Sequence, residues 1–109
     1  MIKKLQDKFL YGYCNVFAVI LNELYKKPIV AFVENEDVIH IAVEYKPMVY
    51  LDASGTTNLT NIKNRYDIKD ARILELSAID AASYLRYNQQ DITDASIVYA
   101  QLKSLKLLP

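Results

Sequence analysis

The first part of the chain is an apolar pattern of helical period. Leu5 and Phe9 stand four residues apart and would share one face of a short helix over residues 2–10. A second and much more apolar helix is expected from about Cys14 to Lys27. It should end there because the residue before a proline, here Pro28, avoids helical backbone angles.

The second helix divides into two stripes. One carries Cys14 with Ala18, Leu21 and Tyr25, and we expect this stripe to face inward. The other is narrow and polar, and its members are Asn15, Asn22, Glu23 and Lys26. Since every remaining position is apolar, most of this helix should be buried.

The pattern then changes to β-branched and aromatic runs separated by polar turns, which predicts strands. The expected strands are Ile29–Val33, Val38–Val43, Met48–Leu51 and, farther along, Arg72–Leu76. Residues 53–58 are expected to form a loop, and residues 59–70 one helical turn followed by more loop.

Two helices are predicted to close the chain. Ser77 is a candidate N-cap, with Asp80 three residues later, for a helical segment that runs to about Asn88. The last helix is expected to start near Thr93, with Ile92 packed just before its cap. Its apolar stripe consists of Ala95, Val98, Tyr99, Leu102 and Leu105.

These elements predict an α+β fold in one domain over residues 1–109, with the Cys14 helix packed on a three- to four-stranded antiparallel sheet. An apolar content of 52% with 24% charged residues is typical of a globular chain. Lys plus Arg and Asp plus Glu are 13 each, so no strong field favours nucleic acid or an acidic membrane surface. We therefore expect neither partner, and the pattern leaves the oligomeric state open.

Cysteine usage narrows the chemistry further. The chain has one cysteine and one histidine, which excludes an internal disulfide framework and argues against a structural zinc site. We expect no metal and no organic cofactor. The basic start and the apolar run from Phe9 to Leu21 lack the cleavage site of a secretory signal, and the run is too short to span a bilayer. The expected location is therefore the cytoplasm, where a lone thiol stays reduced.

The lone thiol follows a turn and opens a helix, which is how many enzymes present a thiolate nucleophile. A partner for Cys14 is suggested by strand register. If Lys46 and Pro47 are the central residues of a tight hairpin, His40 lies opposite Ala53, and a loop one residue shorter places His40 opposite Asp52. Either register brings the imidazole and the carboxylate to nearly the same level of adjacent strands.

A thiol, an imidazole and a carboxylate form the nucleophile, base and orienting group of acyl-transfer enzymes. In this interpretation Cys14 attacks a carbonyl carbon, His40 moves the proton and Asp52 holds the imidazole. The backbone N–H of Cys14 is the natural oxyanion donor. Gln6, Tyr11 and Tyr13 are the open candidates for a second donor. The alternative for each residue is structural: an inert buried cysteine, a core histidine and a turn aspartate.

The stretch Gly12 to Leu21 reads Gly-x-Cys-x-x-Phe-Ala-x-x-Leu and resembles the nucleophile helix of papain-like and transglutaminase-like cysteine enzymes. Pro28-Ile29-Val30, His40-x-x-Val43-Glu44 and Val49 to Ala53 are similar to the strands that follow it there, in the same order of Cys, His and Asp. The resemblance covers about residues 11–55. One departure is that Ile41 and Ala42 follow His40, where transglutaminase-like proteins usually carry an aromatic residue.

The resemblance implies a papain-like core of the minimal size found in phage and bacterial toxin proteins. It implies a cysteine hydrolase: a peptidase, isopeptidase, or glutamine deamidase or transamidase that acts on a protein or peptide amide. The alternative is a non-catalytic protein-binding module or inhibitor built on the same small α+β fold.

Overall fold

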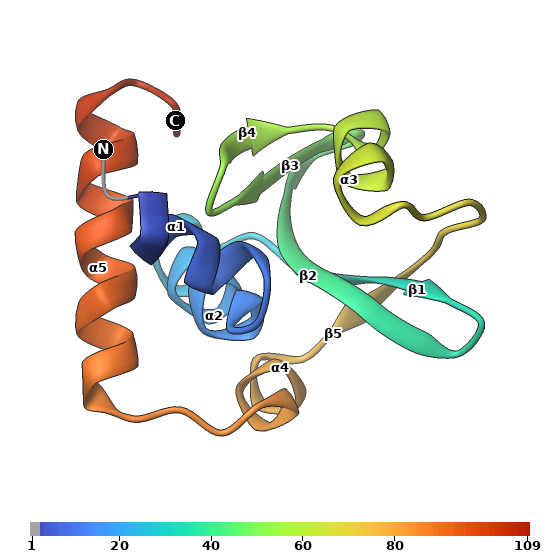
Figure 1. The fold of residues 1–109 in the computed structure, drawn as a ribbon, viewed down its shortest axis with the longest axis horizontal. Helices are drawn as coiled ribbons and strands as arrows, with labels where there is room; N and C mark the ends of the chain where they lie inside the picture. Colours follow the sequence, from blue (N-terminus) through green and yellow to red (C-terminus); the bar gives the residue numbers. More distant parts are fainter. Residues whose placement is uncertain (1–2) are drawn as a thin grey trace.

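Residues 3–109, the part of the chain that the computed structural model describes, form five helices and one five-stranded antiparallel sheet (Figure 1). The helices are α1 (Lys3–Leu10), α2 (Cys14–Tyr25), α3 (Leu59–Tyr66), α4 (Ala78–Tyr84) and α5 (Gln89–Ser104). The strands are β1 (Ile29–Glu34), β2 (Asp37–Lys46), β3 (Val49–Asp52), β4 (Gly55–Thr57) and β5 (Arg72–Leu76). Their order across the sheet is β4-β3-β2-β1-β5. The α+β class and the packing of the Cys14 helix on the sheet are thus confirmed.

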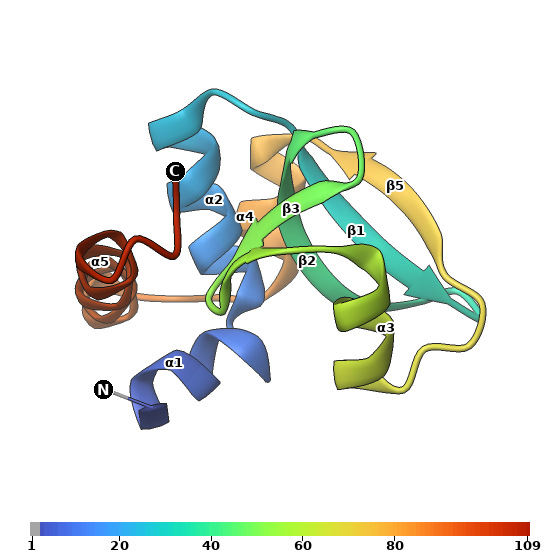
Figure 2. The ribbon, with the colours of Figure 1, turned by 90° about the horizontal axis from the view of Figure 1, so that it is seen from above.

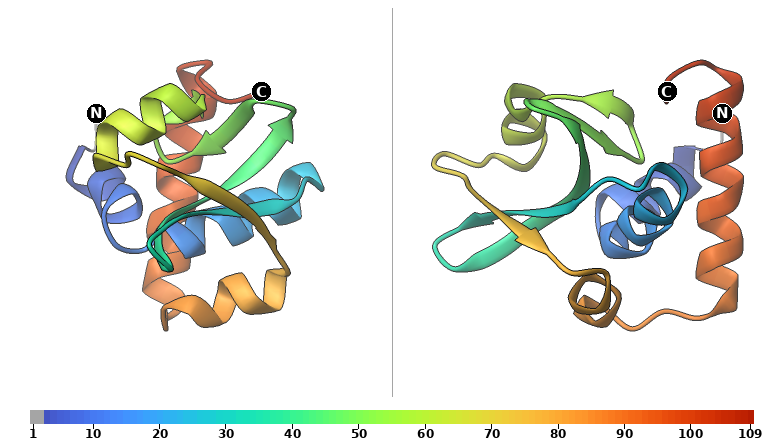
Figure 3. Two further views of the ribbon diagram at one scale, coloured as in Figure 1. Left: turned by 90° about the vertical axis from the view of Figure 1, so that its right-hand side faces the viewer. Right: turned by 180° about the vertical axis from the view of Figure 1, so that it is seen from behind.

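The sheet is curved and has helices on both sides. Viewed from above, α2 lies between the sheet and α5, and α3 covers the other face of the sheet (Figure 2). The turned views show α4 continuing directly from β5 below α2 (Figure 3). Lys8 of α1 forms ion pairs with Asp91 and Asp94 of α5 at 2.7 and 2.9 Å, so the two helices that flank α2 are joined by charge.

Alternating strand residues supply two separate cores. The larger core lies between the sheet and α2, and the smaller one lies under α3. The strand residues of the larger core are Ile29, Ala31, Val33, Ile41, Val43 and Leu51. Those of the smaller core are Val30, Phe32, Ala42 and Tyr50, which pack against Ile62 of α3. This division matters because residues of one parity on β2 and β3 face α3 rather than α2.

The helices expected near the N-terminus are confirmed. Residue 2, the expected start of the first, lies outside the described residues, and α1 ends at Leu10 as predicted. Helix α2 starts at Cys14 and ends at Tyr25, because Lys26 adopts a left-handed conformation with φ 55° and its N–H caps Asn22 O.

Asn15, which the sequence places on the narrow polar stripe of α2, belongs to the buried part of the helix. Asn15 is completely buried, and its side-chain Nδ2 donates to Ala81 O at 3.0 Å and to Leu85 O at 3.1 Å. The pattern failed here because an asparagine can be buried when it satisfies backbone carbonyls of another element. In this fold Asn15 docks α4 on α2.

The prediction of at most four strands was also wrong. The predicted loop at residues 53–58 contains β4, which pairs Tyr50 with Thr57 and Asp52 with Gly55. Gly55 has φ 107°, and a Cβ there would stand 2.8 Å from Leu107 O. Only glycine allows this close approach of the C-terminal segment, whose Leu107 O accepts from Thr56 N at 2.8 Å. A strand of three residues held by a distant segment leaves little local signal.

The hairpin registers proposed from the sequence were wrong by a small shift. Val43 pairs with Leu51, so the same register places Ala42, not His40, opposite Asp52. The turn residues are Pro47 and Met48 rather than Lys46 and Pro47, and a bulge lies before Lys46. Met48 adopts a left-handed conformation with φ 70°, which its residue type does not predict.

The second half follows the expected order with different boundaries. Strand β5 is confirmed, and Ser77 caps α4 by accepting from Asp80 N, but α4 ends at Tyr84 rather than near Asn88. Residues 59–66 form two turns of helix instead of one, because the Asn58 side chain caps α3 at Asn61 N. Helix α5 starts four residues earlier than expected, with Asn88 and Asp91 forming a capping box, so Ile92 lies inside the helix.

Candidate functional site

The centre of the candidate site is a buried pair formed by His40 and Asp52. Nε2 of His40 lies 2.9 Å from Oδ2 of Asp52, and both side chains are essentially inaccessible to solvent. The two residues are diagonal neighbours on the face covered by α3, since Ala42 lies opposite Asp52 in the register. Diagonal Cβ atoms of an antiparallel pair are about 7 Å apart, a gap that an imidazole and a carboxylate can bridge together.

The other donors to Asp52 come from residues that the sequence did not single out. Oδ1 accepts from the backbone N–H of Ser54 at 2.8 Å and from its hydroxyl at 2.5 Å. Oδ2 accepts from Nη1 of Arg65 at 3.0 Å in addition to His40. Nη2 of Arg65 donates to Ser54 Oγ at 2.9 Å, which closes a ring of three side chains. A carboxylate has about four lone-pair sites, so Asp52 is fully satisfied as an anion.

This hydrogen bonding fixes the charge states. Burial alone would raise the pKa of Asp52, but hydrogen bonding and attraction to His40, followed by the charge of Arg65, lower it to about 2. For His40, burial is the largest single influence and lowers the pKa, but the hydrogen bond and charge of Asp52 together with Cys14 outweigh it, so that the net shift is upward. Each group is therefore charged over a wider pH range in the folded protein than it would be in water, as an imidazolium beside a carboxylate.

Two aromatic rings enclose the imidazole. Phe32 on β1 stacks at a centroid distance of 6.1 Å, and Tyr66 at the end of α3 lies at 4.6 Å. The Tyr66 hydroxyl donates to Leu10 O at 2.5 Å, which ties α3 to the end of α1. The sequence has no aromatic residue directly after His40, and Tyr66 could not be expected there because α3 brings that ring in from 26 positions downstream.

Cys14 approaches this pair from the start of α2. Its side chain lines a cavity of about 310 Å³ together with Tyr66, and with Val38 and Ile39, which precede His40 on β2. The body of α2 covers the opposite face of the sheet, so only its first turn reaches the His40 side. Cys14 itself is 8% exposed.

The second nitrogen of the imidazole, Nδ1, does not contact Asp52. In the part of the chain that the structure describes, Nδ1 of His40 is buried and has no hydrogen-bond partner. The thiol of Cys14 also contributes to the raised pKa of His40, after burial, which opposes it, and Asp52. No hydrogen bond joins Sγ of Cys14 to Nδ1 of His40 in the described part of the chain.

No family model matches the chain, and no curated protein or solved structure matches it.

One candidate for the second oxyanion donor is already engaged. Nε2 of Gln6 donates to Ala53 O at 2.7 Å, which fastens α1 to the end of β3. Tyr11 lines the Cys14 cavity and is 63% exposed. Tyr13 lies just before the helix, with Nζ of Lys8 5.3 Å from its ring centroid.

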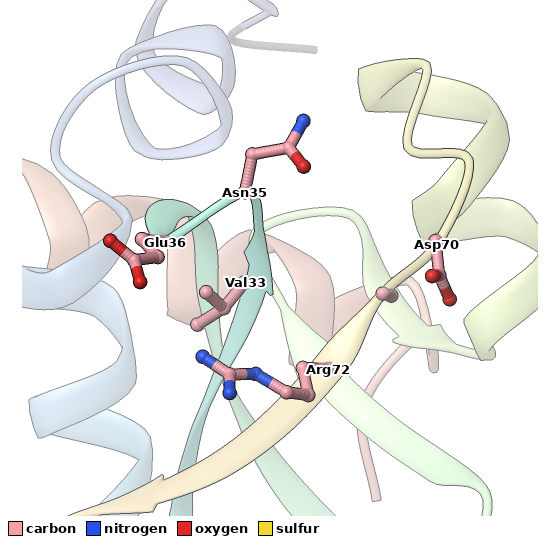
Figure 4. Close-up of a pocket in the computed structure, with 6 residues that line it drawn as sticks. Val33, Asn35, Glu36, Asp70 and Arg72 are labelled. Carbon is pink, nitrogen blue, oxygen red and sulfur yellow. The ribbon is translucent and has the colours of Figure 1, made fainter.

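The rest of the chain holds no further thiol or imidazole, since the sequence has one cysteine and one histidine. A second hollow, of about 260 Å³, is lined by residues of the β1–β2 turn and of the segment that leads into β5, without a cysteine or a histidine (Figure 4). Within residues 3–109, no three His, Cys, Asp or Glu side chains gather as metal ligands. None of the helices over the same residues is both long and apolar enough to cross a bilayer.

Proposed function

We propose that the protein is a cysteine-dependent acyl-transfer enzyme in which Cys14 is the nucleophile, His40 the base and Asp52 the orienting carboxylate. The observation that carries this proposal is the state of His40. Asp52 occupies Nε2, while Nδ1 is buried and has no partner in the described part of the chain, and Tyr66, whose ring lies 4.6 Å from the imidazole, lines the same cavity as Cys14. A buried nitrogen without a partner is costly, and a catalytic role is one of the reasons for which such a group is kept.

The proposed proton route follows from this arrangement. With the Nε2 proton held by Asp52, the lone pair of neutral His40 is on Nδ1 and takes the proton of the Cys14 thiol. The thiolate then bonds to the carbonyl carbon of an amide, and the leaving amine takes the proton back from Nδ1 as the C–N bond breaks. Water resolves the thioester with His40 again as base, which releases the acid and restores the thiol.

The first turn of α2 supplies the expected stabilisation of the oxyanion. The N–H groups at the start of a helix lack intrahelical partners, and Cys14 is the first residue of α2. The developing negative charge would also lie at the positive end of the helix. These features favour the papain-like arrangement, which we retain as the proposed finer class of this fold, with a protein or peptide amide as the substrate class.

The rival function is a protein-binding module without catalysis. The observation that favours it is the burial of both groups: His40 is fully inaccessible, and no hydrogen bond joins it to the thiol. In that case Cys14 and His40 are core residues. The two proposals differ in the reactivity of one thiol, which makes them separable without knowledge of the substrate.

The experiment is alkylation of Cys14 by iodoacetamide at pH 6, followed by mass spectrometry. Cys14 is the only cysteine, so the chain unfolded in denaturant is its own reference. An unperturbed thiol, with a pKa of about 8.5, is almost wholly protonated at pH 6. We expect the folded protein to react on the order of tenfold faster than the unfolded chain, as a thiolate held by an imidazolium does.

His40→Gln should remove this acceleration while the circular dichroism spectrum stays native. Cys14→Ser should likewise fold and should abolish all alkylation. A folded protein that reacts no faster than the unfolded chain would falsify the enzyme and leave the binding module. Unfolding of Cys14→Ser would point to the same conclusion.

A further inference from the structure

The most unusual contact outside the proposed triad is made by Arg65. Its Nη1 lies 3.0 Å from Oδ2 of Asp52, the same oxygen that Nε2 of His40 approaches at 2.9 Å. One carboxylate oxygen thus serves two cations when the imidazole is protonated. The second oxygen is occupied by Ser54 and offers neither cation a better place.

We propose that Arg65 is a positioning residue of this site: by sharing Oδ2 of Asp52 with His40, it limits how tightly the carboxylate can hold the imidazolium. The inference rests on the proposed function, because only a reacting imidazole needs such control. A base that is bound too firmly as imidazolium cannot take a proton from a thiol or from water.

Arg65 is fixed in this role by three contacts. Besides Asp52, it donates to Ser54 Oγ at 2.9 Å, and its Cζ lies 5.5 Å from the ring centroid of Tyr66. Its side chain is 17% exposed, so solvent and salt screen its charge only weakly. Helix α3, capped by Asn58, carries both Arg65 and Tyr66 to the site.

The groups that surround His40 define the sign of the effect. Asp52 from β3 favours the imidazolium, and Cys14 from α2 also favours it. Arg65 from α3 should oppose it, because a second positive charge shares Oδ2 of Asp52. Tyr66 stays neutral because burial raises its pKa. Removal of Arg65 leaves Asp52 with a single cation, so His40 should hold its proton more tightly.

The test uses the fact that His40 is the only histidine, so that its ring protons give one NMR titration. In Arg65→Met the pKa of His40 should rise by about one unit, the size of shift that one nearby charge produces. Lys63→Met is the matched control, because it removes one positive charge from the same helix and its side chain makes no contact with Asp52. It should leave the titration unchanged.

The alkylation profile gives a second measurement. The pH at which the alkylation rate changes from that of the imidazolium-paired thiolate to that of the unpaired thiolate should rise in Arg65→Met by the same shift. If the pKa of His40 is unchanged or lower in Arg65→Met, the inference is overturned. If that variant does not fold, Arg65→Gln removes the charge while keeping an N–H donor and answers the same question.

The two proposals fail in different ways. Slow alkylation of the wild-type protein rejects the enzyme, whatever His40 does. Fast alkylation of the wild type together with an unmoved His40 pKa in Arg65→Met rejects only the role of Arg65.

Discussion

Asp52 shows how one side chain links the fold to the site. Its carboxylate accepts hydrogen bonds from His40, Arg65 and both donors of Ser54, and so joins β2, α3 and the turn before β4. A buried charge is tolerated only when it is paired and hydrogen-bonded in this way. The same contacts that satisfy the anion also fix the tautomer and the orientation of the imidazole.

At the residue scale, Asp52→Asn should therefore affect His40 as well as stability. An amide carries no charge to balance either cation, so burial and Arg65 would lower the pKa of His40 below its ordinary value. Loss of one partner from a buried ionic network should reduce the free energy of unfolding by about 3 kcal/mol or more. NMR titration of His40 and urea denaturation measure the two effects.

Asp67→Asn is the control for this variant, because Asp67 is exposed at the end of α3 and asparagine also accepts its left-handed conformation. It should change neither quantity appreciably. An Asp52→Asn protein with the His40 titration of the wild type would contradict the electrostatic role given to Asp52.

At the scale of elements, the site depends on helices that dock through polar contacts. Helix α4 is only seven residues long and is fastened to α2 by the buried Asn15, whose amide bonds Ala81 O and Leu85 O. Tyr84 of α4 lines the Cys14 cavity, and its hydroxyl donates to Val38 O at 3.3 Å. The docking of α4 therefore helps to shape the wall around the thiol.

Asn15→Ala should loosen this wall. The substitution leaves two carbonyls without their donor and opens a small cavity, so we expect a loss of about 2 to 4 kcal/mol in the free energy of unfolding. Urea denaturation measures it, and hydrogen exchange should show the amides of α4 losing protection first. Glu23→Ala, at an exposed position of the same helix, should stay within about 0.5 kcal/mol of wild type. Equal stability of the two variants would show that α4 is held by other contacts.

At the scale of the whole molecule, the His40–Asp52 pair makes stability depend on pH in both directions. Asp52 has its pKa lowered from 3.8 to about 2, so its contribution is complete above pH 4 and is lost as the pH falls toward 2. The shift corresponds to about 2 kcal/mol. His40 has a raised pKa, so its contribution is complete below 6.5 and is lost as the pH rises through its folded-state value.

These two groups therefore stabilise the fold most between about pH 4 and pH 6.5. Urea denaturation across pH 2 to 9 should show a maximum there. The difference between the wild type and Asp52→Asn should shrink on the acidic side, and that between the wild type and His40→Gln on the alkaline side. Differences that do not vary with pH would show that these groups titrate alike in the folded and unfolded chain.

Much of the architecture could be predicted from local patterns. The apolar run after Gly12, the stop before Pro28 and the β-branched stretches place α1, α2, β1, β2, β3 and β5 near their observed bounds. Ser77 was a correct N-cap for α4 because a cap is a contact between residues three apart. The sequence did not predict the three-residue strand β4 or the early start of α5. Strand β4 was missed because its glycine is required by a contact with the distant Leu107.

The candidate site, too, was predicted only in part from the sequence. The sequence alone proposed His40 and Asp52 as neighbours, since a hairpin brings adjacent strands together whatever its register error. Only the tertiary structure decided which nitrogen of His40 meets Asp52 and which is left without a hydrogen-bond partner among the described residues. It also showed that Ser54, Arg65 and Tyr66 contact the His40–Asp52 pair. Arg65 and Tyr66 lie on α3, and no local sequence pattern determines where that helix packs. Periodicity records which side of an element is apolar, whereas the partners of a buried charge are set by where distant elements pack.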